Sequence, residues 1–377
     1  MALTLKNDSA KQTQIFTKGK RYLKTALLCE LHICAKIGAM KTRKPYLDFI
    51  RILAILMVVY VHTGPEAAER YLVATDKVTY WFALALNAFT QTCAPLFFMV
   101  SGAVLLRKKE SLKEIYLHRV VKFLVLLLVF GLIEYAYFYH LNPEITFSIK
   151  TFFYLVYSTT VIHQYWFLYA YLGILLVLPL LRILAQNMEP EHFCYLAALM
   201  LVFEGLLPIV EYLWGNSRIA IPMPLLVNTI IYPLMGYFIE NKYDKSYQGI
   251  IYALGACAFV TNTVIGHMAV GARGSAETLD GMTFVIALAI FSGLKVLFEV
   301  KPINEKAAKT ITFLGSGSIM VFLLEPPLRD FFKYIYTWFE PTITWFPAAL
   351  CWVTLACLAG ILIYHLLRLI PGVKKVL

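Results

Sequence analysis

The sequence predicts an all-α, polytopic integral membrane protein with about ten transmembrane helices and both termini in the cytoplasm. The chain of 377 residues is 60% hydrophobic and only 15% charged, whereas a soluble domain is nearer half apolar and a quarter charged. Lys and Arg are also concentrated in alternate connections between apolar segments. The composition predicts the fold class, and the charge distribution predicts the orientation.

Three regions are expected along the chain. Residues 1–45 contain ten Lys and Arg and a broken apolar part, which is typical of a basic cytoplasmic arm on anionic lipid; a translation start at Met40 is an alternative. Residues 46–369 are expected to form the ten-helix membrane domain, and residues 370–377 a short basic cytoplasmic tail. The seven cysteines show neither paired nor metal-ligand spacing, so we expect no disulfide framework and no metal site.

Ten apolar segments approach the length of about 20 residues that a helix needs to cross the hydrocarbon core. The second contains Pro95 and Gly102, and Pro326-Pro327 interrupts the ninth. Both segments are therefore expected to bend where neighbours satisfy the freed backbone groups. Residues 315–318, Gly-Ser-Gly-Ser, lack the Lys and the strand–loop–helix context of a phosphate loop and predict close helix packing instead. The segments are 46–64, 79–106, 118–139, 165–185, 192–212, 222–240, 247–269, 280–299, 310–336 and 342–369.

The orientation follows from the positive charges. With the N-terminus inside, the cytoplasmic side carries 26 Lys and Arg and the outer side carries 7. Cytoplasmic loops of membrane proteins are enriched in these residues. The net charge of +11 is therefore assigned to topology in the cell membrane and not to nucleic-acid binding.

The first apolar segment carries ionisable residues at both ends. Arg51 lies near its cytoplasmic end and His62 at its outer end, about 16 Å apart along a helix and on nearly the same face. An ionisable residue in a membrane segment is costly and indicates a functional site. Two plainer interpretations stay open: His62 simply meets water at the interface, and Arg51 reaches the headgroups or pairs with Asp48 one turn away.

Two further groups fall at the depth of His62. His163 lies at the outer mouth of the fourth segment, beside Tyr165 and Trp166, and Glu325 lies in the outer half of the ninth. The aromatic cluster is also typical of an interfacial belt. Glu325 is harder to dismiss, because an unpaired carboxylate there would take up a proton or attract a cation.

Four motifs resemble the acyltransferase-3 family of integral-membrane acyltransferases. Arg51 and His62, with ten residues between them, are similar to the family's Arg-x10-His signature. Residues 95–102 (PLFFMVSG), 163–168 (HQYWFL) and 318–324 (SIMVFLL) are similar to its later motifs. The likeness covers about 46–369, and ten helices agree with the family.

The late motif departs from the family pattern. Many members end it with His where this chain has Glu325, and Phe322 replaces a common Tyr. A carboxylate can accept a proton or orient an imidazole, but an ionised carboxylate is not a donor. The role of the ninth segment is therefore left open.

The resemblance implies transfer of an acyl group, usually acetyl, from cytoplasmic acyl-CoA to a hydroxyl of an extracytoplasmic glycan or related cell-envelope acceptor. Acyl-CoA, usually acetyl-CoA, would be the donor co-substrate of this O-acetyltransferase, and no permanently bound cofactor is expected. The expected partners are the lipid bilayer, the glycan acceptor and the glycan-synthesis machinery.

The same resemblance implies roles for the site residues. Arg51 would contact the donor's phosphate or thioester region, and His62 would be the general base or a transient acyl carrier. His163 and Glu325 would orient His62 or the sugar. Trp166 and Tyr165 would contact the substrate, with Trp166 as a stacking wall.

Two other functions agree with parts of the sequence. A transporter or flippase for a lipid-linked glycan would line its path with the same polar residues, but the inverted repeats that would favour it are not evident in the sequence. A purely structural membrane component leaves the intramembrane Arg51 unexplained.

Overall fold

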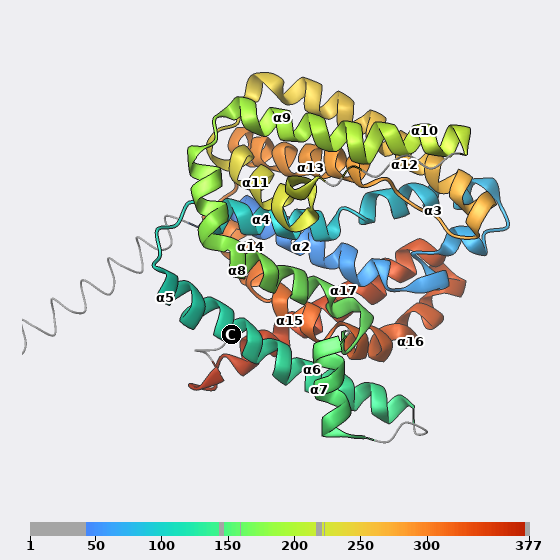
Figure 1. Ribbon diagram of the computed structural model, residues 1–377. Helices are drawn as coiled ribbons and strands as arrows, with labels where there is room; N and C mark the ends of the chain where they lie inside the picture. Colours follow the sequence, from blue (N-terminus) through green and yellow to red (C-terminus); the bar gives the residue numbers. More distant parts are fainter. Residues whose placement is uncertain (1–42, 143–146, 159, 216–220, 222, 374–377) are drawn as a thin grey trace, which may run out of the picture. The chain divides into compact units, whose positions relative to one another are not determined.

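The computed structural model describes residues 43–142, 147–158, 160–215, 221 and 223–373. The chain divides into two units, Met1–Pro45 and Tyr46–Leu377, and the second unit contains nearly all of the described residues. Most of the basic arm, including the alternative start at Met40, lies outside the described residues. Within them every regular element is a helix and no strand occurs (Figure 1), which confirms the predicted all-α fold.

The helices are joined by short connections, several of which are single helical turns. A π-helical turn (Tyr116–Val120) joins α5 to α6, another (Val202–Leu206) joins α9 to α10, and a 3-10 turn, η4 (His163–Tyr165), precedes α8. In order, the helices are α2 (Pro45–Val61), α3 (Lys77–Thr90), α4 (Cys93–Leu105), α5 (Leu112–Ile115), α6 (Val121–Leu141), α7 (Ile149–Ser158), α8 (Trp166–Asn187), α9 (Pro190–Leu201), α10 (Leu207–Trp214), α11 (Asn228–Asn241), α12 (Gln248–Arg273), α13 (Asp280–Val300), α14 (Glu305–Ser316), α15 (Ser318–Leu323), α16 (Glu325–Ile343) and α17 (Trp345–Leu367).

The described residues contain seven helices long and apolar enough to cross a membrane, and eight if one bent pair counts as a span. The bent pair is Glu305–Leu323 with Glu325–Ile343, which meet at 100°. The seven are Lys77–Leu105, Leu112–Leu141, His163–Asn187, Pro190–Trp214, Lys245–Arg273, Asp280–Val300 and Trp345–Leu367. The chain is thus a multi-pass membrane protein by its helices.

The predicted ten crossings are not confirmed, because two of the ten segments form shorter helices than expected. α2 has 17 residues and α11 has 14; at 1.5 Å per residue α11 is about 21 Å long, against a hydrocarbon core of about 30 Å. α2 ends at Val61, and Gly64, three residues later, turns the chain with a φ of +64°. α11 begins only at Asn228, because Val227 before it is extended. The orientation stays a prediction that the charge asymmetry carries.

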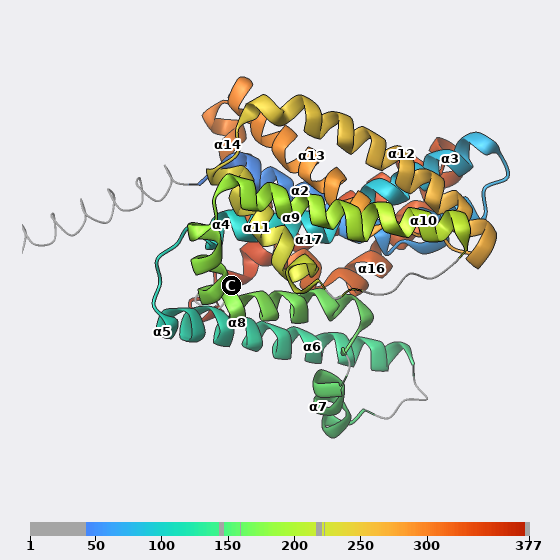
Figure 2. The ribbon, with the colours of Figure 1, turned by 45° about the horizontal axis from the view of Figure 1, so that its top comes forward.

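Small residues allow the closest helix contacts, as the sequence predicted for residues 315–318. A Cβ on Gly102 of α4 would lie 1.9 Å from the carbonyl oxygen of Pro233 in α11, and Gly236 approaches α4 equally closely. A Cβ on Gly315 would lie 2.8 Å from that of Asp48. Figures 1 and 2 also show α12 beside α13 and α16 beside α17, pairs that pack along their lengths.

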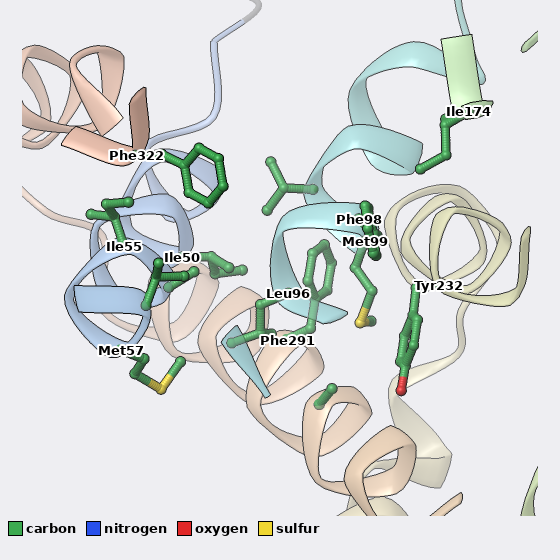
Figure 3. Packing of buried hydrophobic residues seen from close by; sticks show 14 of the residues in the cluster. Ile50, Ile55, Met57, Leu96, Phe98, Met99, Ile174, Tyr232, Phe291 and Phe322 are labelled. Atoms are coloured by element: carbon green, nitrogen blue, oxygen red, sulfur yellow. The ribbon is translucent and has the colours of Figure 1, made fainter. Parts of the chain in front are cut away.

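The apolar core that positions the site lies around α2 and α4. Figure 3 shows side chains of these two helices buried together with Tyr232 of α11 and Phe291 of α13. α2 contributes Ile50 and Ile55, which are at most 1% exposed. Because both residues are locked in this core, α2 is held in place, and with it Arg51 within the helix and His62 directly after its last residue.

Candidate active site

His62 follows the last residue of α2, and a hydrogen-bonded turn holds it there. The hydroxyl of Thr63 donates to the carbonyl oxygen of Tyr60 at 2.6 Å and accepts from the backbone N–H of Ala68 at 3.0 Å. Both bonds are buried, so the turn is satisfied without water. The imidazole is 23% exposed and is therefore presented at the end of a fixed helix.

Glu325 is placed by the break between α15 and α16. Pro327 has no N–H to give to the carbonyl oxygen of Leu323, four residues earlier, which disfavours a continuous helix here. Prolines are tolerated in the first turn of a helix, and α16 accordingly starts at Glu325 with the two prolines directly after it. The predicted bend is thus confirmed. It leaves a carboxylate at a helix N-terminus, where the helix dipole favours negative charge.

These two segments bring His62 and Glu325 together. The Nδ1 atom of His62 lies 3.3 Å from Oε2 of Glu325, whose side chain is 1% exposed. Arg329, one turn later on α16, donates from Nη1 to Oε1 of Glu325 at 2.9 Å. A buried carboxylate is costly unless it is paired, and Arg329 supplies the pairing charge. The arrangement favours the imidazole form that carries its proton on Nδ1, which leaves the lone pair of Nε2 free.

His62 opens onto a cavity of about 350 Å³. Its wall combines an aromatic surface, Trp166, with polar side chains from several helix ends. The polar members are Gln91, His163, Gln164, Asn228, Thr278, Asp280 and Thr283. We call this space the outer cavity. Its size is at the lower end of the range for small-molecule sites, and its groups are suited to a polar ligand.

Several of these polar residues were not predicted from the sequence. Asn228 and Asp280 are the first residues of α11 and α13, and Gln91 lies at the break between α3 and α4. The sequence does contain a signal for them. Polar residues at helix ends or helix breaks line cavities more often than they face lipid when they lie at one membrane depth. The sequence analysis had selected at this depth only three ionisable residues, His62, His163 and Glu325.

The other residues predicted for the site differ in where the structure places them. His163 lines the outer cavity, but the contact that the structure records for the imidazole of His62 is with Glu325. Tyr165, predicted to contact substrate, is fully buried and does not line the outer cavity. Its hydroxyl donates at 2.9 Å to the carbonyl oxygen of Leu323, which the proline break leaves free. The contact that the structure records for the Tyr165 hydroxyl is thus at the break, and its substrate role stays a prediction.

Arg51 lines a second cavity, of about 260 Å³, which we call the inner cavity. Nη1 of Arg51 lies 2.5 Å from Oδ1 of Asp48, so the pairing that stood as an alternative in the sequence is present. A guanidinium has five N–H donors, and this pair leaves donors for another anion. Lys122 of α6 and the hydroxyls of Ser101 and Ser318 line the same space.

The charge of the inner cavity is positive. Within the described parts of the chain, Lys122 forms no ion pair with a carboxylate, and Asp48 offsets the charge of Arg51. Lys122 had been counted in the sequence only as a loop charge that fixes topology. The inner cavity therefore suits an anionic ligand.

The two cavities have three lining residues in common, Phe97, Phe167 and Phe322. We call these three rings the aromatic partition. Arg51 lines the inner cavity and His62 the outer cavity, so the aromatic partition belongs to the walls of both. Among the residues that the structure describes, no group of three or more His, Cys, Asp or Glu is arranged to hold a metal ion.

Comparison with protein families gives a match that covers both cavities. The acyltransferase-3 family model, described as an acyltransferase domain, matches residues 44–364, which is nearly the whole chain and includes every residue of both cavities. Comparison with curated proteins and with solved structures gives no match.

Proposed function

The chain belongs to the acyltransferase-3 family, and from this premise we propose that it moves an acyl group, normally acetyl, from cytoplasmic acyl-CoA to a hydroxyl of an extracytoplasmic glycan. The observation that carries the proposal is the series His62–Glu325–Arg329, built on a buried carboxylate, at a polar cavity. An imidazole oriented by a carboxylate is the arrangement that activates hydroxyl groups in acyl transfer.

The outer cavity is assigned to the acceptor. Sugars present many hydroxyls, and the amide, hydroxyl and carboxylate groups of this cavity can donate to them and accept from them. Trp166 is 44% exposed and offers a flat apolar face for a sugar ring. The extracytoplasmic location of this cavity rests on the charge asymmetry of the sequence.

The inner cavity is assigned to the donor. Coenzyme A carries phosphates, and Arg51 and Lys122 are the cations that face this space. Arg binds phosphate with a planar fork of donors, and Lys binds it as a point charge. The same charge asymmetry places Arg51 toward the cytoplasm, where acyl-CoA is available.

The proposed reaction balances with the groups present. Nε2 of His62 takes the proton of the acceptor hydroxyl as its oxygen attacks the thioester carbonyl carbon. A C–O bond forms, the C–S bond breaks, and the proton on His62 goes to the departing thiolate, so that the products are the ester and free CoA. Glu325 stabilises the imidazolium between these steps. An acyl-His62 relay uses the same atoms and differs only in forming a covalent intermediate.

The first measurement is the ester content of surface glycan in cells that produce wild type or His62→Ala. The second supplies acetyl-CoA, labelled in the acetyl group, to membrane vesicles from the same cells and measures the label transferred to glycan. We expect the variant to lose about 10²–10⁴-fold in transfer while still accumulating in the membrane. His365→Ala is the matched control, because His365 bonds to the carbonyl of Phe313 and lines neither cavity.

Two outcomes would overturn the proposal. Full esterification in His62→Ala would remove the catalytic role of the imidazole. Glycan export that depends on His62, with no ester on the wild-type product, would instead establish the transporter function.

A further inference from the structure

The aromatic partition joins three helices at the boundary between the proposed donor and acceptor sites, and its role rests on the proposed function. Phe97 lies on α4, Phe167 on α8 and Phe322 on α15. The ring of Phe167 is the central one: its centroid lies 5.8 Å from that of Phe97 and 5.2 Å from that of Phe322. Both pairs are tilted, at 59° and 57°, in the range of favourable aromatic contacts. Three helices thus meet through one ring.

The partition stands between the groups that must act together. The cations that suit the donor's phosphates line the inner cavity, and the imidazole that suits the acceptor hydroxyl lines the outer cavity. Because the two cavities share these three rings, the rings lie along the way of a thioester from Arg51 and Lys122 to His62. The donor's path therefore crosses the partition.

The rings have space in which to move. Phe97 and Phe167 are half-buried and line both cavities, although Phe167 also stacks on Phe98 with centroids 4.9 Å apart; Phe322 is 6% exposed and Phe291 is fully buried. A side chain in a close-packed interior is held in one rotamer by its neighbours, whereas a ring beside empty space can change rotamer at small cost. Opening by a ring rotation therefore needs no movement of a whole helix.

We propose that the aromatic partition is the constriction through which the thioester arm passes, and that Phe167 sets the maximum width of the acyl group that reaches His62. An unbranched acyl chain has the cross-section of the arm that carries it, whatever its length. A branched acyl group is wider at the carbon next to the carbonyl. The constriction therefore selects by branching more strongly than by length.

Butyryl-CoA and isobutyryl-CoA are the matched probes, because the two acyl groups are isomers that differ in width and not in composition. The measured quantity is the ratio of kcat/KM for isobutyryl-CoA to kcat/KM for butyryl-CoA, with the purified protein in lipid vesicles. One misplaced methylene-sized group typically costs about 10–200-fold in a packed site. We expect wild type to discriminate against isobutyryl by an amount in this range.

Phe167→Ala and Phe167→Leu should each raise the ratio, by about tenfold or more for Ala, and Phe167→Trp should lower it. Phe167→Ala should also release CoA faster in the absence of an acceptor, because water of the outer cavity then reaches the thioester. Phe291→Leu is the control, since Phe291 lies in the core and lines neither cavity. It should lower stability without changing the ratio.

The outcomes for the constriction and for the proposed function are distinguishable. If wild type transfers acyl groups and the ratio stays within about twofold in the Leu and Trp variants, the constriction is refuted and the function stands. If Phe167→Ala does not fold, Phe167→Leu and Phe167→Trp still test the constriction, because the first should raise the ratio and the second should lower it. If wild type transfers no acyl group from any thioester, the function fails and the constriction fails with it.

Discussion

Replacing Glu325 with glutamine removes the negative charge beside His62 and keeps the shape of the side chain. In the proposed reaction His62 becomes an imidazolium whose Nδ1 lies 3.3 Å from the carboxylate oxygen. Two unit charges at this separation attract by about 5 kcal/mol at an effective dielectric constant near 20. Arg329, bonded to the other oxygen at 2.9 Å, offsets part of this attraction. We therefore expect kcat to fall by about 10²–10³-fold.

The assay measures kcat and KM for acetyl-CoA separately in purified protein. Because Glu325 lines neither cavity, its loss should lower kcat with KM for the donor nearly unchanged, as for an interaction made in the transition state. Glu325→Asp keeps the charge at a greater distance and should fall between wild type and Glu325→Gln. Glu340→Gln is the control on the same helix, because Glu340 forms a half-exposed pair with Arg70 at 3.5 Å, and such pairs contribute little.

A wild-type kcat in Glu325→Gln would refute the electrostatic role of the carboxylate. An equal loss in Glu325→Asp and Glu325→Gln would refute it as well, because the effect would then be one of geometry and not of charge.

Two further predictions test the donor side and the orientation. Arg51→Lys keeps the charge of the inner cavity but removes the planar fork, so KM for acetyl-CoA should rise more than KM for the acceptor; equal changes in the two would exclude a donor-specific contact. Reporter fusions at Lys109, Lys245 and Lys301 should read cytoplasm and those at Lys77 and Arg273 outside, following the 26-to-7 charge split; the same side for Lys109 and Lys77 would contradict the predicted topology.

Local features of the structure were predictable from local sequence. The break at Pro326-Pro327 follows from two missing N–H groups. The close packing at Gly315 follows from the absence of a side chain. The pair of Arg51 with Asp48 follows from a spacing of one helical turn. Each of these depends on residues that are neighbours in the chain or on a property of one residue type.

Features that depend on distant segments were not predictable in the same way. Apolar character does not fix where a helix starts, so α11 proved shorter than its apolar segment. Arg329 was counted as an outer loop charge, although it lies one turn from Glu325 and neutralises it. The aromatic partition needs three segments to meet, and no spacing within any one of them indicates that meeting.

The pairing with Arg329 also bears on the open role of Glu325. The family's common His at this position can donate or accept a proton, whereas the carboxylate of Glu325 accepts a hydrogen bond from Nη1 of Arg329 at 2.9 Å. An ionised Glu325 accepts hydrogen bonds and does not donate them. Arg329 donates to Oε1 of Glu325, and Nδ1 of His62 lies 3.3 Å from Oε2 of the same carboxylate; a proton on Nδ1 would leave Nε2 to accept. A base that faces the outer cavity is what an acceptor hydroxyl requires, so replacing the family's His with Glu is compatible with the reaction proposed for this chain.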